Sequence, residues 1–248
     1  MILLFPKEHG AYGQLFLPLL TALFLHGMPR LATLLLFLSA SFLFWSHEPL
    51  LVLMGHRGTR AQREQGRMAS GLFPLLLLGT LLGILGALFV RPQIGWTFLL
   101  PLAMGLCVVP FMLLRHEKST LAELLVALSL SSWVVPLQVS KSVPLSLSLH
   151  LWASLGFLFC VAVLSVRGLM NKIALGWSVG LALAGIALWA GLAQLWTLPR
   201  ENIWPQIPTV ALAIGLAAKK PGPRALRQVG WAIVAATVVQ IGLLQLSR

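Results

Sequence analysis

Residues 69–90, with the sequence ASGLFPLLLLGTLLGILGALFV, form an apolar stretch that contains no charged side chain. A helix needs about 20 mostly apolar residues to cross the hydrocarbon core of a bilayer, which is about 30 Å thick. The stretch therefore predicts a transmembrane helix. Its glycines at 79, 83 and 86 indicate close packing against another helix, because small residues let two helix backbones approach each other.

Eight further apolar runs lie on either side of this stretch, and together they use nearly the whole chain. They occupy residues 10–27, 31–54, 95–114, 121–139, 145–166, 173–196, 205–218 and 226–246. The sequence thus predicts an all-α, polytopic membrane helix bundle of about nine transmembrane helices. The runs at 10–27 and 205–218 are short for a bilayer, so a count of eight stays open.

The composition supports a single transmembrane domain over residues 1–248. Of these residues 58% are apolar and 10% are charged, whereas about a quarter of a soluble domain is charged. The net charge of +12 does not indicate nucleic-acid binding, because the cations lie between apolar runs, where they set topology and contact anionic lipids. Cys107 and Cys160 lie inside apolar runs and are interpreted as small hydrophobic residues.

The placement of the cations along the chain predicts the orientation of the bundle. With the N-terminus in the cytoplasm, 13 of the 18 cations fall on cytoplasmic segments: Lys7, Arg57, Arg60, Arg63, Arg67, Arg115, Lys118, Arg167, Lys172, Lys219, Lys220, Arg224 and Arg227. The other five are Arg30, Arg91, Lys141, Arg200 and Arg248. This bias follows the positive-inside rule. Along the chain, cation-rich connections alternate with cation-poor ones. An even number of helices would break this alternation, so the pattern favours nine.

The segment that leads into the first apolar run, PKEHGAYGQ at residues 6–14, is dense in ionisable groups. It contains Lys7, Glu8, His9 and Tyr12, the only tyrosine of the chain. Two interpretations are open. In the first, the segment caps the helix at the interface, since an acid offsets the helix dipole and a lysine meets lipid phosphate. In the second, it lines a polar site at the membrane surface.

His47 and Glu48 interrupt the second apolar run about 10 Å from its basic end, given the rise of a helix. Ionisable groups at such a depth usually face a bundle interior or a wet cavity, so we expect a functional site here. The alternative is a helix kinked by Pro49 whose glutamate pairs with a neighbouring Lys or Arg. The basic segment 55–67 follows directly. Its arginines and glycines suit a phosphate or diphosphate, but a cytoplasmic loop without a ligand has the same composition.

Two further polar segments lie on the predicted cytoplasmic side. In one of them, Arg115 and Lys118 are candidate anion contacts. Thr120 and Glu123 have the spacing of a capping box, which indicates a helix cap rather than a catalyst. In the other segment, Arg167 closes the sixth apolar run, either as an anchor or as a site residue.

Three stretches resemble the YwiC-like family of bacterial membrane proteins: PKEHGAY at 6–12, HEPL at 47–50 and GHRGTRA at 55–61. The resemblance implies a multi-pass protein of the bacterial inner (plasma) membrane. A looser resemblance is to the UbiA superfamily of intramembrane prenyltransferases. These have nine helices, a cytoplasm-facing cavity, and polar motifs at the inner ends of the second and sixth helices. The stretch at 47–50 falls at the first of these motifs and Arg167 at the second.

The UbiA resemblance implies a UbiA-like enzyme or lipid-binding protein that acts on a polyprenyl or other isoprenoid diphosphate. The residues expected to hold the diphosphate are Lys7, Arg57, Arg60, Arg115, Lys118 and Arg167. Those expected to take part in catalysis are Glu48, His47, His9 and Glu8. Mg²⁺ would be bound by Glu48 and Glu8, with Glu117 as an alternative to Glu8. The chain departs from that superfamily because it contains no aspartate. An arginine at the second motif suggests direct anion binding in place of a second metal.

Two other functions stay open. A transition-metal or haem site would use His9, His47, His56 and His116 with Glu8 and Glu48, because imidazole suits zinc and iron. Alternatively, the protein is a carrier of a lipid or anion without chemistry, although transporters often show internal repeats and none is evident here. The expected partners are a membrane lipid or an isoprenoid diphosphate, with no nucleic acid, and the sequence indicates no oligomeric state.

Overall fold

The computed structural model describes residues 9–170, 174, 176–195, 205–219 and 226–246, and every regular element in these ranges is helical. The elements in chain order are α1 (His9–Phe24), α2 (Leu31–Leu53), α3 (Thr59–Val90), η1 (Pro92–Phe98), α4 (Leu99–Leu113), α5 (Thr120–Ser132), α6 (Val134–Ser140), α7 (Leu145–Leu169), α8 (Gly176–Leu195), α9 (Ile207–Lys219) and α10 (Leu226–Leu246). The prediction of an all-α fold is confirmed.

Six helical segments in the described ranges are long and apolar enough to cross a membrane. They are Leu31–Leu53, Thr59–Val90, Pro92–Leu113, Thr120–Ser140, Leu145–Leu169 and Gln228–Leu246. Three shorter apolar helices, Ala11–Phe24, Gly176–Ala187 and Ile207–Lys219, fall in the other three predicted runs. The chain is therefore an all-helical protein with six candidate membrane spans, and nine spans stay a prediction.

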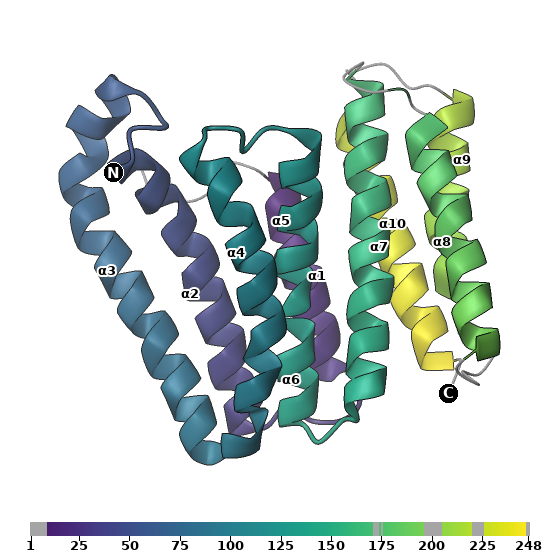
Figure 1. Cartoon of the computed structure of the whole chain (residues 1–248), viewed down its shortest axis with the longest axis horizontal. Helices are drawn as coiled ribbons and strands as arrows, with labels where there is room; N and C mark the ends of the chain where they lie inside the picture. The colour runs from purple at the N-terminus through teal and green to yellow at the C-terminus, as the bar shows by residue number, and fades with distance from the viewer. Residues whose placement is uncertain (1–8, 171–173, 175, 196–204, 220–225, 247–248) are drawn as a thin grey trace.

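The helices lie side by side with their long axes roughly aligned, and within residues 9–170 the connections alternate between the two ends of the bundle (Figure 1). One end carries the α2–α3 turn, the α4–α5 loop and the C-terminal end of α7; we call it the Glu48 end. The opposite end carries the α1–α2 turn, the turn from α3 to η1, and the α6–α7 turn; we call it the Lys141 end. The described chain begins at the Glu48 end.

The main core lies where α1, α2, α6 and α7 meet. Its fully buried side chains include Leu15, Leu36, Leu137 and Leu155, one from each of these helices. The most deeply buried candidate span is α7, whereas α3 stands at the edge of the bundle and exposes leucines such as Leu82. An exposed leucine face is expected of a membrane helix, because lipid tails are as apolar as leucine.

The glycines of the apolar stretch 69–90 let α3 pack closely against α2. A Cβ atom added at Gly83 would lie 2.1 Å from the hydroxyl oxygen of Ser39, and one at Gly79 would lie 2.9 Å from the ring of Phe42. Both distances are shorter than van der Waals contact, so a larger side chain would push the helices apart. The predicted close packing at these positions is confirmed.

The third helix is longer than the apolar stretch that predicts it. The expected span is 69–90, but α3 begins at Thr59, so most of the basic segment 55–67 is helical rather than a loop. Arginine, alanine, glutamine and glutamate form helices readily, which extends α3 past its apolar part. Gly58 precedes the helix with a φ of 89°, a conformation that favours glycine.

The fifth predicted run, residues 121–139, is divided between α5 and α6 at Trp133. Pro136 has no N–H to donate to the carbonyl oxygen of Ser132, which explains the break in the hydrogen-bond ladder. The two helices still follow one another as a single candidate span, Thr120–Ser140.

Candidate functional site

The polar end of α2 forms an ion pair with the turn that follows it. The Arg57 guanidinium donates from Nε to Oε1 of Glu48 at 2.8 Å and from Nη2 to Oε2 at 2.6 Å. The Glu48 side chain is 4% exposed and that of Arg57 is 24% exposed. This two-point contact between planar groups is the geometry in which arginine binds a carboxylate most strongly.

The geometry of the turn explains how Arg57 reaches back over α2. Gly55 has a φ of 72°, and the N–H of His56 bonds to the carbonyl oxygen of Leu51 at 2.9 Å. These are features of a Schellman motif, which ends a helix with a left-handed residue, usually glycine. The motif reverses the chain and places residues 56 and 57 beside the last turns of α2.

The pair bears on the predicted roles of Glu48 as catalyst and metal ligand. Both of its oxygens accept hydrogen bonds from one guanidinium, so the negative charge of Glu48 is already balanced by Arg57. The alternative that the sequence left open, a proline-containing helix whose glutamate pairs with a nearby arginine, describes the observed arrangement. The same contact engages Arg57, one of the predicted diphosphate ligands.

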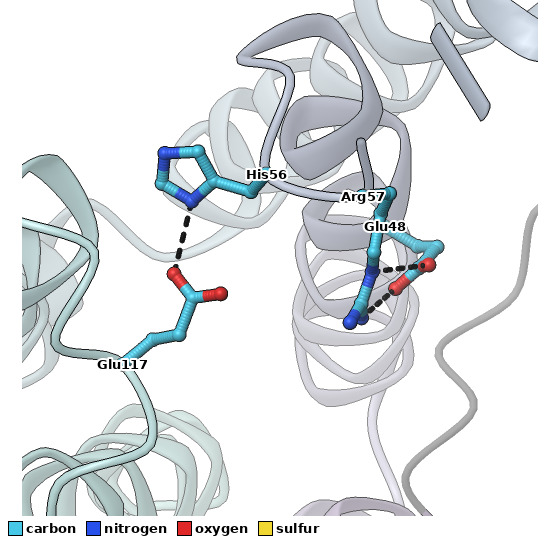
Figure 2. Close-up of polar contacts among 4 residues, drawn as sticks. All are labelled: Glu48, His56, Arg57 and Glu117. Carbon is cyan, nitrogen blue, oxygen red and sulfur yellow. Dashed lines mark hydrogen bonds and ion pairs between the residues drawn. The ribbon is translucent and has the colours of Figure 1, made fainter. Parts of the chain in front are cut away.

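A second contact joins the α2–α3 turn to the α4–α5 loop. The Nδ1 atom of His56 lies 2.9 Å from Oε2 of Glu117, and the two residues are 61 positions apart in the chain. Figure 2 shows that His56 points toward Glu117 while its neighbour Arg57 points back toward Glu48. Consecutive side chains of one turn therefore contact two different elements.

A third contact joins α7 to the start of α5. Arg167 donates from Nε and Nη2 to the two carboxylate oxygens of Glu123, at 2.8 and 2.6 Å, and Nη2 also donates to the backbone carbonyl of Lys118. The predicted capping box of Thr120 and Glu123 is wrong. Ser119 caps α5 instead, because its extended backbone lets the hydroxyl accept the N–H of residue 122, and this leaves Glu123 to bind Arg167.

The N-terminal motif contacts α2 through Tyr12. The Tyr12 ring meets the Phe44 ring edge-on, with centroids 5.0 Å apart, and the phenol lies within electrostatic reach of Glu48. Phe16 and Trp45, with centroids 6.3 Å apart, continue this aromatic cluster between α1 and α2. The part of the N-terminal motif that the structure describes therefore lies beside the second polar motif.

The other predicted site residues lie around these contacts. Arg60 donates to Glu64 within α3 at 2.8 Å, and both side chains are exposed. Arg115 and Lys118 are exposed in the α4–α5 loop, and His47 is half-buried on α2. Lys7, Glu8 and the side chain of His9 lie outside the described residues.

Two residues have roles that the sequence pattern did not reveal. Glu117 and Glu123 contact His56 and Arg167, whereas the sequence indicated Glu117 only as an alternative Mg²⁺ ligand and Glu123 only as a helix cap. The only signal was their position in a polar segment between two apolar runs. Their partners lie more than 40 residues away, so no local spacing points to the contacts.

The carboxylates of the described residues do not fit a Mg²⁺ site. Glu48, Glu64, Glu117 and Glu123 each contact an arginine or a histidine. In the described part of the chain, no three or more His, Cys, Asp or Glu side chains are grouped so that they could hold a metal ion. We derive no step through Mg²⁺ from these residues. The metal and haem interpretations also invoke residues 8 and 9, and they stay predictions.

A groove of about 260 Å³ lies between α1 and α10. Its lining is mostly apolar and includes Leu17, Phe24, Val238 and Ile241. The groove lies toward the Lys141 end, whereas the UbiA resemblance implies a cavity at the other end. A cavity at the Glu48 end stays a prediction.

The fold and the site define an all-helical protein of the membrane type, with arginine–glutamate ion pairs and the His56–Glu117 contact gathered at one end of its bundle. A model of the YwiC-like protein family matches residues 5–139, which is more than half of the chain. The chain belongs to the YwiC-like family. The matched part includes the Glu48–Arg57 and His56–Glu117 contacts but not Arg167. No curated protein and no solved structure matches the chain.

Proposed function

We propose that this protein binds the diphosphate group of an isoprenoid or other lipid diphosphate at the Glu48 end of its bundle. The observation that carries the proposal is that two contacts join the polar segments selected from the sequence. The His56–Glu117 contact joins the segment after α2 to the α4–α5 loop. Arg167 joins α7 to the same loop through the Lys118 carbonyl and to the start of α5 through Glu123. Predicted anion contacts from three parts of the chain are thereby brought to one end of the bundle.

The exposed cations around these contacts would meet the anion first. Arg115 and Lys118 are exposed in the α4–α5 loop, and Arg60 is exposed on the first turn of α3. Exposed cations raise the local concentration of a multiply charged anion and speed its association. Arg57 and Arg167 are already held by glutamates, so less side-chain entropy would be lost when they contact a ligand.

A lipid ligand suits this position. Lipid phosphates lie at the membrane interface, level with the ends of spanning helices, where cationic side chains attract them. The aromatic cluster of Tyr12, Phe16, Phe44 and Trp45 lies beside Glu48 and would pack against the start of the apolar chain. The diphosphate head group would then contact the cations, and the apolar chain of the same ligand would contact the aromatic rings.

A nine-span, UbiA-like bundle with a cytoplasmic N-terminus in a bacterial inner membrane is part of the proposal. Six candidate spans and three shorter apolar helices would make nine traverses, and the connections within residues 9–170 alternate between the two ends (Figure 1). Most cations of residues 9–170 belong to the segments at the Glu48 end, where the described part of the chain also begins. The positive-inside rule then favours a cytoplasmic position for that end.

Binding and prenyl transfer are two forms of this proposal. Transfer by a UbiA-like enzyme would require an acid or base, for which His47 and His9 are the candidates, and Mg²⁺ according to the resemblance. Binding alone requires only the cations. The described geometry favours binding, because its four glutamates are all engaged by other side chains.

Thermal unfolding of the purified full chain in a neutral detergent, titrated with a non-hydrolysable farnesyl diphosphate analogue, tests the proposal. A ligand at a hundred times its dissociation constant stabilises the folded state by about 2.7 kcal/mol. The double variant Arg115→Gln/Lys118→Gln should weaken binding at least tenfold. The matched control Arg63→Gln/Arg67→Gln removes the same charge from the same end, from two exposed residues outside the predicted contact set, and should bind nearly as well as the wild type.

The titration separates the possible outcomes when it is repeated with Mg²⁺ and with a chelator. A shift in both conditions supports metal-free binding, and a shift with Mg²⁺ alone supports the transferase form. Equal losses in the two double variants would reduce the effect to non-specific charge attraction. No saturable shift in either condition would refute the proposal.

The break between α5 and α6 favours a second candidate, a lipid or anion carrier. Discontinuous helices line the binding sites of many transporters. Beyond the break, Gln138 is fully buried, and its Oε1 atom has no hydrogen-bond partner among the described residues. Counterflow of labelled substrate in proteoliposomes would support a carrier, and binding without counterflow would exclude it for that substrate.

A further inference from the structure

Two arginines converge on one serine at the Lys141 end of the bundle. Arg30 donates from Nη1 to Oγ of Ser142 at 3.0 Å, and Arg91 donates from Nη1 to the same oxygen at 2.7 Å. The three residues come from the α1–α2 turn, the end of α3 and the α6–α7 turn. The two nitrogens are about 6 Å apart at most, because both lie within hydrogen-bond distance of one atom.

No carboxylate of the described residues balances these two guanidinium groups. The four glutamates that the structure describes each contact another side chain, and they belong to segments at the opposite end of the bundle. The shared acceptor is a neutral hydroxyl. Like charges held this close repel each other, so an anion that contacts both arginines would stabilise the arrangement.

The α6–α7 turn is fixed in place by its neighbour Lys141. The buried Lys141 ammonium donates to the backbone carbonyl oxygens of Leu25 at 2.6 Å and Leu23 at 2.9 Å, at the C-terminal end of α1. Ser142 follows with a φ of 69°, a left-handed conformation that is uncommon for serine. The serine hydroxyl is therefore presented from an anchored turn rather than from a free loop.

The surroundings of the two arginines are apolar and exposed. Leu31 follows Arg30 in the chain, and Met28 and Phe89 lie two residues before Arg30 and Arg91. All three apolar side chains are more than half exposed. Exposed apolar side chains beside cations, at the end of candidate membrane spans, indicate the level of lipid head groups. A ligand with both a phosphate and an apolar chain fits these surroundings better than a small anion does.

We propose that Arg30, Arg91 and Ser142 form a phosphate-binding site that takes the head group of an anionic phospholipid. Each arginine presents a planar set of N–H donors that matches phosphate oxygens, and the serine hydroxyl can donate once an anion replaces it as the acceptor. Inorganic phosphate shares this chemistry, and the experiment distinguishes the two sources. The site lies at the end opposite to the proposed diphosphate site and is independent of it.

Native mass spectrometry of the full chain tests the proposal, after release from nanodiscs that contain equal amounts of phosphatidylcholine and phosphatidylglycerol. The wild type should retain phosphatidylglycerol in preference. The Arg30→Gln/Arg91→Gln variant should retain at least tenfold less of it. The Arg63→Gln/Arg67→Gln variant loses the same charge at the opposite end and should behave as the wild type. No preference in the wild type, or equal losses in both variants, would overturn a head-group site.

A parallel thermal titration with inorganic phosphate in a neutral detergent identifies the source of the phosphate. A saturable shift that the Arg30→Gln/Arg91→Gln change abolishes, without lipid retention, would assign the site to free phosphate. Lipid retention without such a shift would assign it to the head group, and the absence of both would overturn the proposal. If the glutamine variant does not fold, Arg30→Lys/Arg91→Lys keeps the charge but removes the planar donors. It should still weaken retention several-fold.

Discussion

Replacing Arg57 with methionine should destabilise the folded chain by about 3–5 kcal/mol, because the carboxylate of Glu48 would stay buried without its cation. The Glu48 side chain is 4% exposed, too little for water to take the place of the guanidinium. The change also removes two charge-assisted hydrogen bonds, at 2.6 and 2.8 Å. Each such bond contributes about 1.5–3 kcal/mol, which agrees with the same range.

A second substitution makes this prediction specific to the pair. Glu48→Gln alone should cost about 1–3 kcal/mol, because the partly exposed Arg57 can still be solvated. Introduced into the Arg57→Met background, Glu48→Gln should instead recover about 2–3 kcal/mol, since it removes the uncompensated buried charge. A change that destabilises the wild type and stabilises the variant is the signature of a buried pair.

Equilibrium unfolding in mixed micelles, followed by tryptophan fluorescence, measures these free energies. Arg60→Met is the matched control, because Arg60 is 90% exposed in its pair with Glu64 and should contribute less than about 1 kcal/mol. The reasoning is refuted if Arg57→Met costs no more than this control, or if Glu48→Gln gives no recovery in the Arg57→Met background. Either result would mean that water reaches the pair as it reaches a surface salt bridge.

Three further substitutions test local structure by their effect on thermal unfolding. Gly83→Ala should cost about 1–3 kcal/mol, because its Cβ would lie 2.1 Å from the Ser39 hydroxyl oxygen. Gly66→Ala is the control, with no atom within 4 Å of the new Cβ, and equal melting temperatures for the two would contradict the packing of α3 on α2. Ser119→Ala should cost about 1 kcal/mol through the loss of the α5 cap, and Ser119→Asp should cost much less. Arg115→Gly should raise the melting temperature, because the φ of 58° at this position costs a non-glycine residue about 1 kcal/mol; lower stability would instead reveal a structural contact of the arginine.

The helices could be predicted because a membrane leaves the backbone few alternatives. Without water, every N–H and carbonyl group of a span must be paired within the chain, so an apolar run such as 145–166 becomes a helix. The limits of the helices were harder to predict. The polar first turns of α3 depend on helix propensity, and the break at Trp133 depends on a proline. The pattern of apolar residues predicts neither of these features.

The sequence selected several of the residues that form polar contacts at the Glu48 end, but only one of these contacts, the pairing of Glu48 with a nearby arginine, was among its alternatives. Glu48 was chosen as a candidate because it lies deep in an apolar run, and Arg57 because it belongs to a cluster of cations. The two residues are nine positions apart, so a single turn brings them into contact. Glu117 and Glu123 carried no comparable signal, because their partners belong to other helices. The sequence therefore predicted free cations for an anion, where the structure shows Arg57 and Arg167 engaged by carboxylates.

By itself, the sequence determined that the chain is helical and apolar enough for a membrane, and that most of its charges lie outside the apolar runs. These properties depend on composition and local order, which every residue carries with it. Only the tertiary structure decided that Arg167 meets Glu123, that His56 meets Glu117, and that two arginines meet at Ser142. Such contacts depend on which helices become neighbours and how each is rotated about its axis, and these are results of packing over the whole bundle.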